Sequence, residues 1–331
     1  MVHIRDLLVR IYWGPFRALV QRLPLSWAYA LGTFLGRFLG RLPNARLLGM
    51  ALAARRAPEL AGPGVTDADR LRLARKALVN FCLNDLEVLL FPRLNAGVMD
   101  KIMRIEGREH LDAALAKGRG AMLVFGHFGA NQMIMPAIGY AGYEMFQLSA
   151  PASALNEKLP EKRGAAVRRT RELRWEHEQT LPVTHINIFG SMKPALACLK
   201  DNKVLGVAMD GGGGDKRVLV PFLGARAYFS VGAASMAMRT GCAVIPAFML
   251  READGYNRLV LEEELALAIP GEGEGGGRNK AAWEAALTEN VARMAARLDA
   301  RVRARPDLYL YFLSFRELMA KGGHDPFFAE R

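Results

Sequence analysis

His127 is the residue whose type and position point most directly to chemistry. An apolar, partly β-branched stretch at 121–125 stops at Gly126, and His127, Phe128 and Gly129 follow before a helix-like stretch at 131–138. Such a strand-to-helix corner holds a side chain at the carboxyl edge of a sheet, where open α/β folds place their ligands. Because the pKa of an imidazole is naturally close to neutral pH, a histidine at this edge can act as a general base. The alternative interpretation is a structural histidine at a strand end.

Asp210 occupies a comparable position. It ends a second apolar stretch, at 204–209, and a run of glycines follows it. If the two stretches are strands of one sheet with their carboxyl ends at the same edge, His127 and Asp210 lie at that edge together. We therefore expect both residues to be catalytic.

The rest of the chain alternates between strand-like and helix-like patterns. Strands are expected near 121–125, 144–149, 183–189, 204–209, 242–249 and 257–264, and helices near 4–20, 25–40, 67–92, 131–141, 153–180, 191–200, 230–240 and 280–304. This alternation predicts an α/β fold with a mainly parallel or mixed central sheet flanked by helices. We place this domain at residues 67–331 and assign residues 1–66 to an N-terminal helical segment.

The N-terminal segment has the pattern of an amphipathic helix that lies on a membrane. Apolar residues recur at helical spacing between Leu7 and Val20, and arginines are interspersed at positions 5, 10, 17 and 22. No stretch of about 18 or more uncharged apolar residues occurs, so a spanning helix is not indicated, and no signal-peptide cleavage site follows a compact apolar run. We expect this segment to associate with a membrane. The alternative is an amphipathic helix that packs on the protein's own core.

The composition of the chain limits the classes of partner that it is expected to bind. The 331 residues carry a formal net charge of +12, which suits anionic lipid, an acidic protein or nucleic acid. Nucleic acid is disfavoured because the sequence has no zinc-ligand set, helix-turn-helix pattern or RNP-type aromatic strand. The isolated thiols Cys82, Cys198 and Cys242 have neither metal nor disulfide spacing and suit a reducing cytoplasm. We expect an anionic membrane surface as a partner, and neither a metal nor another cofactor.

Several separate blocks resemble, in order and spacing, the bacterial lipid A late acyltransferase family of the lysophospholipid acyltransferase superfamily. The segments 105–111, 118–120 and 126–129 resemble its N-terminal motif block, 199–203 and 207–210 its strand ending in aspartate, and 220–224 its Val-Pro-Phe-Phe-Gly block. Residues 305–316 are similar to its closing segment, although the usual tryptophan and histidine are absent. Blocks spread over much of the chain are more specific than any single motif.

One departure from the family pattern falls on the chemistry. The family signature is His-x-x-x-x-Asp/Glu, and the position of the acid is occupied here by Gln132. The family's carboxylate orients the imidazole and stabilises the imidazolium, as the aspartate does in a serine-protease triad. A glutamine oxygen can accept a hydrogen bond from the ring but brings no charge. Three interpretations are open: Gln132 is an engineered change, Asp210 or another acid supplies the carboxylate, or the chain is a weak or non-catalytic relative.

Other residues are candidates for binding substrate. Lys216 and Arg217 follow the glycine run 211–214 and can hold phosphate, although four glycines also fit plain flexibility. Arg169 belongs to a basic helical face that either is solvated or contacts lipid phosphate or carrier protein. Gly129 and Phe222, which lie in the blocks that carry the resemblance, are further candidates.

The resemblance implies a membrane-associated acyltransferase. It would transfer a fatty acyl chain from an acyl-carrier-protein or CoA thioester to a hydroxyl or amine of a lipid or glycolipid. The protein would be a peripheral or monotopic protein at the cytoplasmic face of the inner membrane. As in that family, His127 would remove the acceptor's proton, and Gln132 would orient its ring. The alternative is a catalytically weak or inactive lipid-binding relative.

Overall fold

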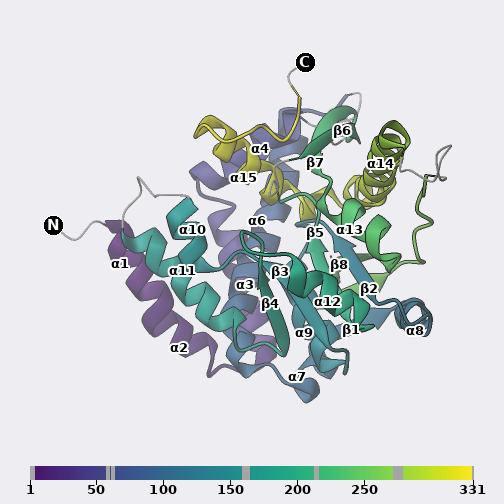
Figure 1. Cartoon of the computed structure of the whole chain (residues 1–331). Coiled ribbons are helices and arrows are strands. Elements are labelled where there is room, and N and C mark those ends of the chain that lie inside the picture. The colour runs from purple at the N-terminus through teal and green to yellow at the C-terminus, as the bar shows by residue number, and fades with distance from the viewer. Residues whose placement is uncertain are drawn as a thin grey trace.

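A central sheet with helices on both faces organises the molecule (Figure 1). The computed structural model describes residues 4–56, 60, 64–158, 165–211, 216–270 and 279–329. The sheet has seven strands in the order β1-β9-β8-β2-β5-β3-β4, and every neighbouring pair is parallel except β8 and β9. The predicted α/β fold with a mainly parallel central sheet is confirmed.

Six of the seven strands lie close to their predicted positions, and β1 was not predicted. The sheet consists of β1 Met103–Glu106, β2 Ala121–Phe125, β3 Met145–Ser149, β4 Val183–Asn187, β5 Val204–Ala208, β8 Ala243–Arg251 and β9 Asn257–Leu261. A separate antiparallel hairpin, β6 Arg217–Phe222 with β7 Ala225–Ser230, was not predicted. Its turn residues Leu223 and Gly224 both have positive φ, at 51° and 76°. Because leucine is unusual at a turn position with positive φ, the sequence does not indicate this hairpin.

Helices cover the sheet and form the two ends of the chain. They are α1 Ile4–Ile11, α2 Arg17–Val20, α3 Leu25–Leu39, α4 Ala45–Arg56, α6 Asp67–Leu90, α7 Ala96–Ile102, α8 Arg108–Leu115, α9 Ile134–Tyr140, α10 Ala152–Lys158, α11 Ala165–Glu178, α12 Lys193–Lys200, α13 Gly232–Thr240, α14 Lys280–Ala304 and α15 Leu310–Lys321. Of these, α4, α7, α8 and α15 were not predicted. A π-helical turn at Tyr12–Phe16 joins α1 to α2.

Strand β2 shows why both faces of the sheet must be covered. All its residues are buried. Met122 and Val124 belong to one apolar core, whereas Leu123 and Phe125 belong to the other. Alternate residues of a strand point to opposite faces, so an unbroken apolar run is the pattern of a strand with a core on each side.

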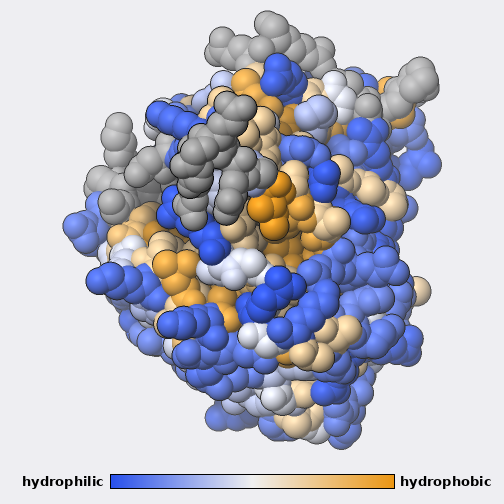
Figure 2. Space-filling view, turned by 45° about the vertical axis from the view of Figure 1, so that its right-hand side comes forward, coloured by the Kyte–Doolittle hydropathy of each residue, from blue (hydrophilic) through white to orange (hydrophobic). Residues whose placement is uncertain are grey.

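The N-terminal helices pack on the domain through part of the predicted apolar face. Trp13 is 5% exposed and Val20 is fully buried, and both belong to the second core, whereas Leu7 and Leu8 are 52% and 58% exposed. The face is therefore divided between packing and exposure. Figure 2 shows that most of the surface on one side of the molecule is hydrophilic, with apolar residues gathered near its centre. In the described residues, no helix combines the length and apolarity that crossing a bilayer requires.

Helix α6 is joined to the sheet by a buried polar cluster around Glu87. Glu87 is 2% exposed and accepts hydrogen bonds from Tyr29 of α3, from Arg251 of β8 and from Asn257 of β9. The Arg251 guanidinium also donates to Asn84 of α6 at 2.6 Å. The burial of this carboxylate is tolerated because it accepts hydrogen bonds from three side chains, one of them a cation. The cluster fixes α3 and α6 against the two antiparallel strands.

We expect Glu87→Gln to destabilise the fold strongly, because the Arg251 cation stays buried while its counter-charge is lost. Removing one partner of a buried ion pair costs about 3–5 kcal/mol. Equilibrium unfolding in urea measures the loss. The matched control is Glu289→Gln, which removes the acid of an exposed pair with Arg293 and should cost about 1 kcal/mol or less. Equal losses in the two variants would contradict a structural role for the Glu87 cluster.

Candidate active site

His127 and Asp210 meet because their strands are parallel neighbours in register. Phe125 at the end of β2 lies beside Ala208 at the end of β5. The backbone N–H of Met209 donates to the Phe125 carbonyl at 2.9 Å, which carries the pairing just past the strands. His127 and Asp210 each lie two residues beyond this last pair. They are therefore held side by side at the carboxyl edge of the sheet, as the sequence predicts.

Asp210 holds the imidazole through a bidentate arrangement. The His127 backbone N–H donates to Oδ2 of Asp210 at 2.8 Å, and Nδ1 of the ring lies 2.6 Å from Oδ1. An ionised carboxylate only accepts hydrogen bonds, so Nδ1 carries the proton and Nε2 is left with its lone pair. The His127 side chain is 37% exposed, whereas that of Asp210 is fully buried. The arrangement therefore presents a basic nitrogen to the outside and keeps its counter-charge inside.

Two glycines beside His127 are required by close contacts. A Cβ at Gly126 would lie 2.8 Å from Oδ2 of Asp210 and 2.6 Å from the Leu298 side chain. A Cβ at Gly129 would lie 2.0 Å from the Met249 carbonyl oxygen, and its φ of 60° also favours glycine. Between them, Phe128 is 1% exposed and packs in the core. The Gly-His-Phe-Gly run thus lets the chain pass closely over the sheet while His127 stays outside.

Tyr309 and Phe312, from the closing segment, complete the surroundings of the dyad. The Tyr309 hydroxyl donates to Oδ2 of Asp210 at 2.8 Å. The Phe312 ring stacks on the His127 ring with centroids 4.5 Å apart and planes 5° apart. Burial, and then the negative charge of Asp210, raises the pKa of Tyr309 well above its ordinary value, so the phenol remains a donor. Neither role was predicted from the sequence, although both residues lie in the closing segment of the resemblance.

A polar contact with α6 places this closing segment. Asn80 of α6 donates to the Asp307 side chain at 2.9 Å, and Arg305 also pairs with Asp307, at 3.0 Å. The Gly129 backbone N–H then donates to the Leu308 carbonyl at 2.8 Å. These bonds hold the 3₁₀ turn Pro306–Leu308 against the His127 loop. The Arg-Pro-Asp sequence therefore serves to bring Tyr309 and Phe312 over the dyad.

The expected contact between Gln132 and the ring is absent from the structure. Gln132 lies in the 3₁₀ turn Asn131–Met133; its Oε1 accepts from Arg174 at 3.0 Å and its Nε2 donates to Glu178 at 3.2 Å. Arg174 also pairs with Asp85 at 2.7 Å. Among the described residues no hydrogen bond links Gln132 to His127. The 3₁₀ turn and these partners direct the amide towards α11, and the carboxylate beside the ring belongs to Asp210.

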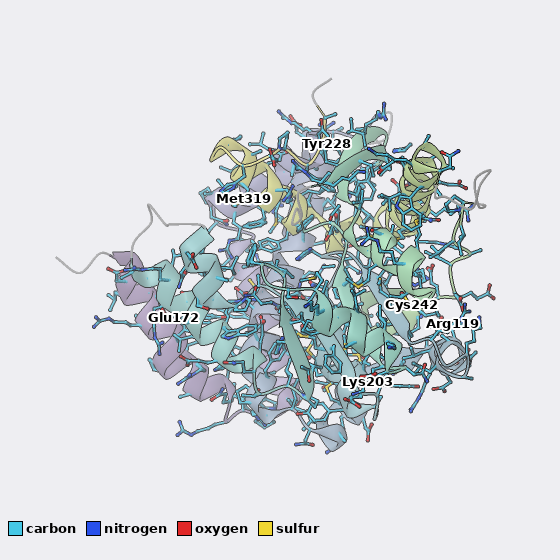
Figure 3. All side chains as sticks on the ribbon, in the orientation of Figure 1. Arg119, Glu172, Lys203, Tyr228, Cys242 and Met319 are labelled. Carbon is cyan, nitrogen blue, oxygen red and sulfur yellow. The ribbon has the colours of Figure 1, made fainter. Side chains whose placement is uncertain are left out.

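The expected substrate-binding cations lie in two different parts of the molecule. Lys216 pairs with Glu284, and Arg217 pairs with Asp325 at 2.5 Å and lies over the Tyr228 ring. Arg169 of α11 pairs with Glu172 and Glu176 at 3.2 and 3.1 Å. Figure 3 shows Tyr228 with the hairpin at the top and Glu172 well to the left. The structure does not bring Arg169 together with Lys216 and Arg217.

The remaining candidates serve the fold around the site. Gly129 lets its backbone pass close to that of Met249, and its carbonyl accepts a hydrogen bond from Asn84 at 2.8 Å. Phe222 is 1% exposed and packs on Phe229, Tyr309 and Phe327, so it touches the dyad only through Tyr309. Residues 212–215, most of the glycine run proposed as a phosphate loop, lie outside the described residues.

Comparison with known proteins identifies relatives of this chain. A family model described as bacterial lipid A biosynthesis acyltransferase matches residues 3–315. The chain is also 26% identical over 195 residues to a phosphatidylinositol mannoside acyltransferase of Mycolicibacterium smegmatis. That match covers 58% of this chain and 60% of the relative, so less than two thirds of the relative's length is covered.

We expect Tyr309→Phe to lower the free energy of unfolding, because it removes the donor to a buried carboxylate oxygen. A hydrogen bond to a charged group contributes about 1.5–3 kcal/mol. The matched control is Tyr311→Phe, two residues further along, whose side chain packs on Phe81 and is 37% exposed. Urea unfolding of the two variants gives the comparison. Equal stabilities of the two variants would show that the Tyr309 hydroxyl does not hold Asp210.

Proposed function

The chain belongs to the bacterial lipid A biosynthesis acyltransferase family, and on this basis we propose that it transfers a fatty acyl chain from an acyl thioester to a hydroxyl or amine of a lipid or glycolipid. The family and the mannoside acyltransferase relative indicate an acyltransferase that acts on lipid or glycolipid. The finer proposal is that the donor is a thioester of acyl carrier protein or CoA. An acidic carrier protein would complement the net charge of +12.

The observation that carries the proposal is the half-exposed imidazole held by a buried carboxylate. With Nδ1 bound to Oδ1 of Asp210 at 2.6 Å, Nε2 of His127 is the available base. It takes the proton of the acceptor hydroxyl or amine while that atom attacks the thioester carbonyl carbon. The carbon–sulfur bond then breaks, and the imidazolium returns the proton to the leaving thiolate. Asp210 stabilises the imidazolium between these steps, as a triad aspartate does.

Membrane association is proposed for the N-terminal segment, residues 1–66, and in particular for one face of α3. Trp27, Phe34 and Phe38 are 68%, 60% and 46% exposed and recur at helical spacing. Single exposed apolar residues are ordinary, but an aromatic row on one helix is typical of a contact surface. Arg22, Arg37 and Arg41 flank the row and suit anionic headgroups. We propose peripheral or monotopic binding at the cytoplasmic face of the inner membrane.

We expect His127→Ala to abolish acyl transfer and Asp210→Asn to lower turnover severely. In the serine-protease triad the corresponding amide costs about 10⁴-fold, because the ring loses its tautomer and its counter-charge. The measurement is transfer of a radiolabelled acyl group from acyl-CoA and from acyl carrier protein to lipid in mixed micelles.

Gln132→Glu is the matched comparison for Asp210→Asn. It adds the acid of the family signature, but its side chain faces Arg174 and Glu178, so we expect no gain in turnover. A large gain, together with an innocuous Asp210→Asn, would assign the carboxylate role to position 132. Absence of transfer by every protein, Gln132→Glu included, over a range of donors and acceptors would favour the inactive lipid-binding relative.

For the membrane proposal, we expect Trp27→Ser with Phe34→Ser to reduce binding to anionic vesicles, because the apolar row no longer inserts between headgroups. The matched control is Leu196→Ser with Ile269→Ser, which removes apolar residues that are 39% and 69% exposed on other elements. Cosedimentation with phosphatidylglycerol vesicles measures both. Raising the salt should weaken binding further, since the Debye length falls from about 10 Å at 0.1 M to about 3 Å at 1 M. Equal binding of both double variants to the vesicles would show that the aromatic row of α3 does not contact the membrane.

A further inference from the structure

Arg316 lies beside the dyad and has no role in the chemistry described so far. It belongs to α15, one helical turn after Phe312, so both side chains are on the same side of the helix. Phe312 covers the His127 ring, and Arg316 reaches Gly211, the residue after Asp210. Residues of the closing segment therefore bring a guanidinium to the edge of the site.

The Arg316 guanidinium is buried but poorly hydrogen-bonded. The residue is 9% exposed, yet the hydrogen bond recorded for it within the described residues is a long one, 3.5 Å from Nη1 to the Gly211 carbonyl. Its Nε is buried without a partner. A guanidinium offers several N–H donors, and leaving them unpaired in a buried place is costly. Burial accordingly lowers the pKa of Arg316, and the nearby charge of Asp210 partly opposes this.

Two described acids near Arg316, Asp210 and Asp325, are already engaged by other groups. Both oxygens of Asp210 accept from His127 or Tyr309, and within the described residues no ion pair joins Arg316 to Asp210. Asp325, the other nearby acid, pairs with Arg217 at 2.5 Å. Lys216 and Arg217, which the sequence singles out, thus have acidic partners, whereas no ion pair of Arg316 is found among the residues that the structure describes. The unpaired Nε and the weakly paired Nη1 of Arg316 suit an anion that the described residues do not supply.

The backbone next to Arg316 leaves room for such an anion. Gly211 is exposed, and a Cβ built there would find only His127 Cε1 at 3.5 Å and the Ala208 carbonyl at 4.0 Å within contact range. The open side of Gly211 therefore adjoins both the imidazole and the guanidinium. Arg217 adds positive potential to the same place.

We propose that Arg316 anchors an anion subsite beside His127, and that the anion is a phosphate group of a substrate. The planar guanidinium matches the geometry of phosphate oxygens and binds them with paired N–H donors. The proposal rests on the proposed function, which supplies two possible sources of the phosphate. One is the phosphopantetheine arm that carrier protein and CoA share, and the other is the headgroup of a phospholipid acceptor.

Binding of two matched pairs of soluble probes tests the subsite without relying on turnover. Isothermal titration calorimetry compares 4′-phosphopantetheine with pantetheine, and dihexanoyl phosphatidylglycerol with dihexanoylglycerol. We expect the wild-type protein to prefer the phosphorylated member of one pair, and Arg316→Gln to lose about tenfold to a hundredfold of its affinity. Arg316→Lys, which keeps the charge without the fork of donors, should retain part of it. The control is Arg72→Gln, an exposed arginine of α6 that pairs with Asp69.

The possible outcomes distinguish the two sources of the phosphate from each other and from the absence of an anion subsite. If the wild-type protein prefers 4′-phosphopantetheine to pantetheine and Arg316→Gln loses this preference, the subsite binds the donor. If the same is found for the phosphorylated lipid, the subsite binds the acceptor. Absence of any preference in the wild-type protein overturns the proposal, as does a preference that survives in Arg316→Gln. If Arg316→Gln does not fold, as judged by its thermal unfolding, Arg316→Lys decides, and unchanged affinity in that variant would also overturn it. Inactivity of the wild-type protein bears on the acyl transfer alone.

Discussion

The buried carboxylate of Asp210 is the group on which the arrangement of the site depends. Its Oδ2 accepts from the His127 backbone and the Tyr309 hydroxyl, and its Oδ1 faces the ring. These donors come from the loop after β2 and from the start of α15, far apart in the sequence. Buried carboxylate oxygens left without such donors would cost free energy, because nothing would replace their hydrogen bonds to water. The requirement to satisfy it therefore draws the closing segment over the sheet edge and fixes Phe312 on the imidazole.

Glu87 and Asp210, the two buried carboxylates among the described residues, are compensated in different ways. Glu87 is neutralised by Arg251 at 2.7 Å and serves as a structural cross-link. Asp210 accepts from a backbone N–H, the imidazole and a phenol, so in the proposed mechanism its charge is available to the imidazolium. A guanidinium bound directly to Asp210 would compete for that charge. No ion pair joins Arg316 to Asp210 among the described residues, which agrees with the proposed roles of Asp210 in the dyad and of Arg316 in binding an anion.

Features with a local cause were predictable from the sequence, and those made by distant partners were not. The strands β2 and β5 are unbroken apolar runs that end at a polar residue, so His127 and Asp210 could be placed at one edge before the structure was known. Tyr309 could not, because its hydroxyl finds a partner 99 positions away. The hairpin was missed since its turn places a leucine at positive φ. The exposure of Leu7 against the burial of Trp13 likewise depends on tertiary packing.

The glutamine at the family's acidic position and the carboxylate at Asp210 are two parts of one arrangement. The amide of Gln132 accepts from Arg174 and donates to Glu178, which a carboxylate at that position cannot do without protonation. Burial already raises the pKa of Glu178, so a second negative charge beside it would add repulsion in a poorly solvated place. Glutamine is therefore the side chain that satisfies both neighbours at once. Asp210, which follows β5, contacts the ring, whereas Gln132 joins α11 to the turn that follows His127.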